Sequence, residues 1–141
     1  MPIDEMSPSA ARAAMQADAA CAFVDVRTTE EYDRGHPEGA LNVPWAVLDE
    51  ATGRMTPNSR FLPTMQKLFE RKRRLFLSCQ AGVRSMNACR ELEGAGYTTL
   101  VSIVGGFGGK RDPMGSLVAK GWVDSGLPVA SNRSTYPQQA V

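Results

Sequence analysis

The feature that most constrains the fold is a short apolar run that stops at a cysteine and is followed by a glycine-containing loop. Leu75 to Leu77 are apolar, Cys79 follows after one serine, and the stretch from Ser85 to Leu92 has helical composition. A run this short, bounded by polar residues, favours a strand, and Ser85 can cap the helix. The stretch therefore predicts strand, turn and helix, with Cys79 at the C-terminal end of the strand.

This position suits a nucleophilic thiol. In an open α/β sheet, ligands bind at the carboxyl ends of the strands, where the next helix presents free N–H groups and the positive end of its dipole. The thiolate is the reactive form of cysteine, and Arg84 adds a positive charge. The backbone of residues 80–85 can form a nest for an anion, because Gly82 tolerates a positive φ. The expected catalytic residues are Cys79 and Arg84, and the expected substrate-binding loop residues are Gln80, Ala81, Gly82, Val83 and Ser85. The alternative, an inert core thiol, leaves the order of loop, arginine and helix unexplained.

Strands alternate with helices along the chain, which predicts an α/β fold with a central, mainly parallel sheet. Strands are expected near residue 3 and over 21–27, 40–44, 75–79 and 99–104, and helices over 9–18, 30–34, 58–69 and 85–94. Residues 45–58 show no clear period and predict a surface connection. We expect a single domain over residues 1–130 and a disordered polar tail over 131–141.

Composition excludes several classes of function. The chain has 141 residues and a net charge of +1. This charge is too small to attract nucleic acid or an anionic membrane surface. Its three cysteines lack CxxC spacing and it has one histidine, so neither a disulfide framework nor a zinc site is indicated. No apolar run reaches the length of a signal peptide or a membrane span, and the expected location is the cytoplasm.

Three separated motifs resemble those of the rhodanese family of sulfurtransferases. Residues 79–84, Cys-Gln-Ala-Gly-Val-Arg, match the family's C-x-x-G-x-[RS] loop. Residues 25–44 match D-V-R-x-x-x-E-[FY]-x-x-G-H-x-x-G-A-x-N-[IV]-P, and residues 121–128 are similar to the closing G-W-x-x-x-G-[LY]-P. The resemblance implies a three-layer α/β sandwich with helices on both faces of the sheet. It also implies that Cys79 takes a sulfane sulfur from thiosulfate or a persulfide and passes it to cyanide or a thiol, with no cofactor. A sulfur-relay protein is a further candidate partner.

Other candidate residues lie at the same edge of the sheet. Asp25 either holds the cysteine loop, by accepting hydrogen bonds from its backbone or from an arginine, or caps the helix that begins near Thr28. Arg27 is expected near the mouth of the pocket. The glycine-rich stretch 105–109 is expected to form a flexible rim with Phe107 as an apolar wall. His36 lies in a turn and is interpreted as a structural residue.

Two alternative functions stay open. A phosphatase or arsenate reductase has a similar loop, but the phosphatase signature has five residues between cysteine and arginine, whereas this chain has four. A shorter loop is better matched to one sulfur on the cysteine than to a tetrahedral phosphate. A non-catalytic rhodanese-like module that binds a partner or senses sulfur is the other alternative. Gln80 and Ala81 carry no charge, so the donor is unsettled and Arg84 is the expected cation of the loop.

Overall fold

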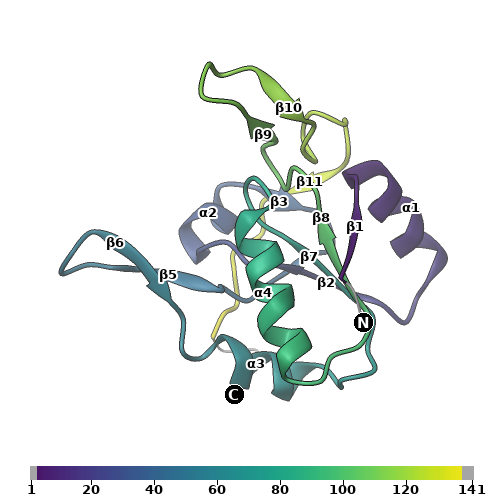
Figure 1. The fold of residues 1–141 in the computed structure, drawn as a ribbon, viewed down its shortest axis with the longest axis vertical. Coiled ribbons are helices and arrows are strands. Elements are labelled where there is room, and N and C mark those ends of the chain that lie inside the picture. The colour runs from purple at the N-terminus through teal and green to yellow at the C-terminus, as the bar shows by residue number, and fades with distance from the viewer. Residues whose placement is uncertain (1–2, 138–141) are drawn as a thin grey trace.

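A parallel five-stranded sheet forms the centre of the protein. The computed structural model describes residues 3–137. The strands are β1 (Asp4–Met6), β2 (Ala22–Asp25), β4 (Leu41–Asn42), β7 (Leu75–Ser78) and β8 (Leu100–Ile103). Their order across the sheet is β1-β8-β7-β2-β4, and every neighbouring pair is parallel (Figure 1). The predicted α/β class is confirmed.

Helices cover both faces of this sheet. They are α1 (Pro8–Ala17), α2 (Thr29–Asp33), α3 (Phe61–Leu68) and α4 (Val83–Gly94). Successive strand residues point to opposite faces. In β7, Leu75 and Leu77 pack in the core beneath α3 and α4, whereas Phe76 packs in the core that contains Ala11 of α1 (Figure 1). The molecule is therefore a three-layer sandwich.

Two helix starts follow the local sequence signals. Ser7 accepts a hydrogen bond from the backbone N–H of Ala10, and Pro8 occupies the first helical position of α1. Thr28 forms a capping box with Glu31 at the start of α2. Asp25 therefore does not cap this helix.

The start of α4 differs from the prediction. Gly82, with φ of 107°, is the N-cap, and the helix begins at Val83. A left-handed φ is accessible to glycine at little steric cost, so the chain turns into the helix at this residue. Ser85 lies in the first turn with its side chain buried, and it does not cap the helix.

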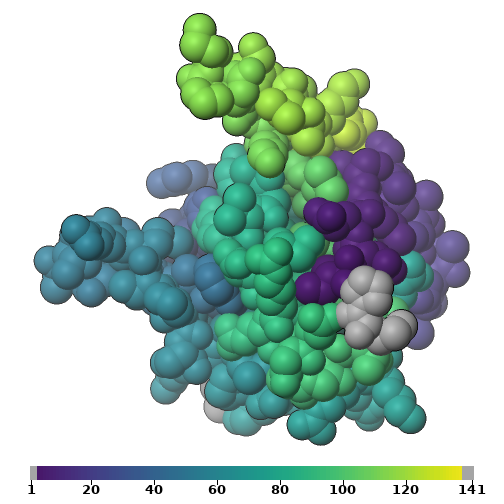
Figure 2. All heavy atoms as spheres, viewed as in Figure 1, coloured from purple at the N-terminus to yellow at the C-terminus, as the bar shows by residue number. Residues whose placement is uncertain are grey.

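The stretch predicted as a surface connection instead contains a hairpin, β5 (Ala46–Asp49) and β6 (Arg54–Pro57). β6 is largely exposed and β5 buries only Ala46, which explains why no inward-facing period marks them. Two further antiparallel pairs join β3 (His36–Pro37) to β11 (Val129–Ala130), and β9 (Lys110–Arg111) to β10 (Leu117–Ala119). Figure 2 shows the β5–β6 and β9–β10 hairpins projecting from the rounded body.

Residues 131–137, part of the tail that the sequence predicts to be disordered, contact the body of the protein in the structure. Ser134 donates from its backbone to Asp33 and from its hydroxyl to Asn42, and Asn132 contacts His36. Tyr136 packs against the core. Two of these partners, His36 and Asn42, are buried polar groups that need hydrogen bonds. Residues 138–141 lie outside the described range. None of the helices within residues 3–137 is long and apolar enough to cross a bilayer.

Candidate active site

Cys79 lies directly after β7, at the bottom of the loop that leads into α4. Its Sγ accepts a hydrogen bond from the backbone N–H of Gly82 at 3.0 Å and lies 3.5 Å from the Ser85 hydroxyl. The residue exposes 1% of its surface. The sulfur thus has one backbone donor and a neighbouring hydroxyl at the N-terminal end of a helix, an arrangement that stabilises negative charge.

A pair of buried hydroxyls extends from the sulfur into the sheet. Ser85 Oγ lies 2.9 Å from Ser102 Oγ of β8, and it also donates to the carbonyl of Gly82 at 3.2 Å. Either serine can be the donor in the pair. When Cys79 is a thiolate, Ser85 can turn its proton toward the sulfur while Ser102 donates to Ser85. No local pattern of residues marks Ser102, because this contact depends on the position of β8 beside β7.

The glycine-rich stretch 105–109 is hydrogen-bonded to the cysteine loop, and Phe107 lines the smaller recess described below. The backbone N–H of Phe107 donates to the carbonyl of Cys79 at 2.7 Å, and that of Gly108 donates to the carbonyl of Gln80 at 2.9 Å. A Cβ at Gly106 would collide with the backbone of Cys79 and Gln80. Glycine is needed here for close approach of two backbones.

Asp25 and Arg27 form a buried ion pair beside this loop. The guanidinium of Arg27 binds both carboxylate oxygens of Asp25, with a shortest distance of 2.8 Å. It also donates to Gln80 Oε1 at 3.2 Å and lies 4.4 Å from the centre of the Phe107 ring. The sequence predicts a place for Arg27 near the mouth of the pocket. In the structure Arg27 is 3% exposed and forms part of the wall of the recess instead. Asp25 supports the loop through Arg27; the contacts of its carboxylate do not include Arg84.

Arg84 is paired with a residue that the sequence did not single out for function. Its two terminal nitrogens bind the two carboxylate oxygens of Glu31 at 2.7 and 2.9 Å. Burial raises the pKa of Glu31, but hydrogen bonds from Arg84 and Thr28 and the charge of Arg84 outweigh it and lower the pKa to about 2. The pair ties α2 to α4. The capping-box pattern marks Glu31 as a helix-start residue, but nothing local indicates a partner 53 residues away.

Two recesses flank this ion pair. The smaller, about 300 Å³, includes Gln80 of the loop, and the larger, about 760 Å³, lies between α2 and the β5–β6 hairpin. Both recesses are lined by Glu31 and Arg34. The other lining residues of the smaller recess are Arg27, Gly35, Gln80 and Phe107. Gln80, the residue after Cys79, thus lines this recess, whereas Cys79 itself does not.

His36 and the other cysteines lie outside this arrangement. His36 is buried and stacked on Tyr32 at 3.5 Å between ring centres, and its two ring nitrogens contact Tyr32 O and Asn132 Oδ1.

Burial, and then the nearby charge of Cys79, raise the pKa of Cys89 to about 12, which keeps this thiol protonated. Across residues 3–137, no group of three or more His, Cys, Asp or Glu side chains is placed to hold a metal ion.

The site consists of one cysteine at the end of a central parallel strand, in a loop that leads into a helix. Comparison with known proteins shows which family has this arrangement. Residues 7–109 match the rhodanese-like domain. The chain therefore belongs to the rhodanese-like domain family.

Its relatives include proteins named for sulfur transfer. The chain is 34% identical over 106 residues to thiosulfate sulfurtransferase 16, chloroplastic, of Arabidopsis thaliana, a match that covers 75% of this chain and 77% of the relative. It is 33% identical over 109 residues to thiosulfate sulfurtransferase 18 of the same plant, covering 76% and 70%. The crystal structure of Rv0390 from M. tuberculosis is similar with a TM-score of 0.76 and 27% identity, covering 94% of this chain and 100% of that one.

Proposed function

We propose that this protein is a sulfurtransferase that moves a sulfane sulfur from a donor such as thiosulfate to cyanide or a thiol through a persulfide on Cys79. The observation that carries the proposal is the position of Cys79 Sγ, which accepts the Gly82 N–H at the N-terminal end of α4. This environment stabilises a negatively charged sulfur both before and after sulfur transfer.

The reaction balances without an external oxidant or reductant. The Cys79 thiolate attacks the outer sulfur of thiosulfate, the S–S bond of the donor breaks, and sulfite leaves with the electron pair. The anionic acceptor, cyanide or a thiolate, then attacks the terminal sulfur of the persulfide. Thiocyanate or a new persulfide leaves, and the Cys79 thiolate is regenerated.

The surrounding residues position the loop for both steps. The Ser85 hydroxyl is placed to donate to the thiolate, and Ser102 supports it. The backbone N–H groups of Phe107 and Gly108 fix the carbonyls of Cys79 and Gln80. Arg84, expected to bind the donor directly, is already held by Glu31, so we assign it to stabilising the loop.

The test is intact mass after incubation with thiosulfate. Wild-type protein should gain the mass of one sulfur atom, lose it on treatment with a thiol, and form thiocyanate from cyanide. Cys79→Ser should do none of these, while Cys21→Ser and Cys89→Ser should behave as wild type. A Cys79→Ser protein that still gains sulfur would overturn the assignment.

The same measurement addresses the alternative functions. A wild-type protein that gains no sulfur from thiosulfate or from an organic persulfide would favour the non-catalytic binding module. The short loop and the buried sulfur count against hydrolysis of a phosphate ester. The cytoplasmic location stays a prediction, which cell fractionation can test.

A further inference from the structure

We propose that Arg34 is the binding residue for the anionic sulfonyl group of the sulfur donor, and that the donor class is an organic thiosulfonate with a single negative charge. The inference rests on the proposed function and names a substrate class for that site. It depends on which positive charges around the cysteine loop are already compensated.

The two other arginines beside the loop are occupied. Arg84 makes two hydrogen bonds to Glu31, and Arg27 binds both carboxylate oxygens of Asp25. Arg27 also donates to the carbonyl of Gly35. A donor that replaced either carboxylate would leave a partly or fully buried acid without its counterion, which is unfavourable.

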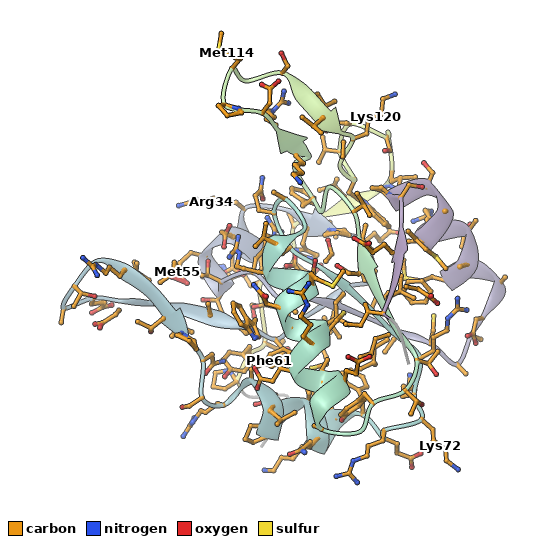
Figure 3. All side chains as sticks on the ribbon, viewed as in Figure 1. Arg34, Met55, Phe61, Lys72, Met114 and Lys120 are labelled. Carbon is orange, nitrogen blue, oxygen red and sulfur yellow. The ribbon has the colours of Figure 1, made fainter. Side chains whose placement is uncertain are left out.

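Arg34 is different. It follows the last residue of α2, it is exposed, and within residues 3–137 its guanidinium has neither an ion-pair nor a hydrogen-bond partner. It lines both recesses, and in the smaller one it lies with Gln80, the residue after Cys79. Figure 3 shows Arg34 toward the end of the molecule where α4 begins. Its five N–H donors are therefore available to an anion that enters beside the loop.

The charges around the smaller recess match a donor with one negative charge. Three arginines (Arg27, Arg34 and Arg84) and two carboxylates (Asp25 and Glu31) leave one uncompensated positive charge. A thiosulfonate supplies one negative charge, which matches this excess, whereas thiosulfate carries two.

A thiosulfonate reacts in the same way as thiosulfate does in the proposed mechanism. The Cys79 thiolate attacks the outer sulfur of a thiosulfonate, the bond between the two sulfurs breaks, and the sulfinate leaves with the electron pair. One persulfide forms, and total charge is unchanged. Arg34 would bind the sulfonyl oxygens equally in the donor and in the departing sulfinate, so its effect should appear in KM for the donor and not in kcat.

Steady-state kinetics with methanethiosulfonate and cyanide test the role of Arg34. Arg34→Ala should raise KM for the donor about tenfold, as expected for loss of one charge-assisted hydrogen bond, with kcat within about twofold of wild type. Arg34→Glu should raise KM further, and Arg34→Lys should recover part of the loss. The matched control is Lys72→Ala, an exposed cation at the opposite end of the molecule (Figure 3), which should leave KM unchanged. An unchanged KM in both Arg34→Ala and Arg34→Glu would overturn the proposal.

A binding experiment separates this proposal from failure of the proposed function. Backbone amide resonances of the wild-type protein and of Arg34→Ala are titrated with methanesulfonate and with sulfate, two inert anions of single and double charge. Wild type should bind methanesulfonate more tightly than sulfate, and Arg34→Ala should weaken methanesulfonate about tenfold. If Arg34→Ala bound methanesulfonate as tightly as wild type does, Arg34 would not be part of the site. If wild type bound sulfate more tightly than methanesulfonate, the proposed donor class would be wrong. Both results are readable even if the wild-type protein transfers no sulfur.

Discussion

At the scale of single residues, the charged groups around Cys79 act in pairs. Glu31 lies in the first turn of α2 and accepts two hydrogen bonds from Arg84, which lies beside the cysteine loop in α4. The two side chains are 27% and 21% exposed, so solvent weakens their attraction without removing it. The pair therefore links the stability of the site to the ionisation of one carboxyl group.

Glu31→Gln should lower stability in a pH-dependent way. The pKa of Glu31 is lowered from 4.5 to about 2 in the folded protein. A lowered folded pKa stabilises the protein above the unfolded value, and this stabilisation is lost as pH falls from about 4.5 toward 2. We expect wild type to exceed Glu31→Gln by about 1 to 2 kcal/mol at pH 7, after allowance for screening, and by little near pH 2.

Urea unfolding at several pH values measures this difference. The control is Glu30→Gln, which removes the neighbouring, exposed carboxylate and should show no matching pH dependence. A Glu31→Gln difference that stays constant from pH 7 to pH 2 would show that the ion pair contributes nothing to stability.

At the scale of elements, the site is formed where the loop after β7 meets the turn after β8. The backbone of 105–109 supplies hydrogen bonds to the carbonyls of Cys79 and Gln80, and it can do so only at very short separation. The left-handed glycines of this turn thus set the shape of the cysteine loop.

Gly106→Ala should distort the cysteine loop. Its added Cβ has no space against the backbone of Cys79, and backbone cannot move aside as a flexible side chain can. We expect a loss of about 2 kcal/mol in the free energy of unfolding and at least a tenfold slower gain of sulfur from thiosulfate. Chemical denaturation and timed intact-mass measurements test the two effects.

Gly115→Ala is the matched control for this change. Gly115 also has a positive φ, 87°, but a Cβ there would meet no atom within 4 Å. This variant keeps the strain of alanine at positive φ and omits the collision. If the two variants lost sulfur loading equally, the close approach of the turn to the loop would not matter.

At the scale of the whole molecule, the segment after β11 joins parts of the chain that the sheet does not connect directly. Asn132, Ser134 and Tyr136 contact residues of β3, α2, β4 and the stretch before α3. Because His36 and Asn42 are buried, loss of these partners would leave polar groups poorly satisfied.

Truncation after Ala130 should therefore destabilise the protein compared with truncation after Pro137. Several hydrogen bonds and the packing of Tyr136 are lost, and we expect a decrease of about 2 to 4 kcal/mol in the free energy of unfolding. Thermal and urea denaturation of the two truncated proteins measure it. Equal stability would mean that residues 131–137 make no net contribution.

The sequence by itself determined the features that depend on neighbouring residues. The Ser7 cap, the Thr28 capping box and the left-handed Gly82 involve groups no more than three residues apart, and such groups meet whenever the local backbone forms. The alternation of strands and helices likewise determined the α/β class, because parallel strands need crossover connections.

Only the tertiary structure decided which side chains meet around the sulfur. The pairing of Glu31 with Arg84, the contact of Arg27 with Gln80 and the hydrogen bond of Phe107 to Cys79 join residues far apart in the chain. Ser85 is another example. A serine near a helix start is typical of an N-cap, but in the structure Ser85 is buried beside Ser102 and contacts the thiol. These contacts arise from the strand order, which brings segments far apart in the chain to one edge of the sheet, and no local pattern of residues carries that information.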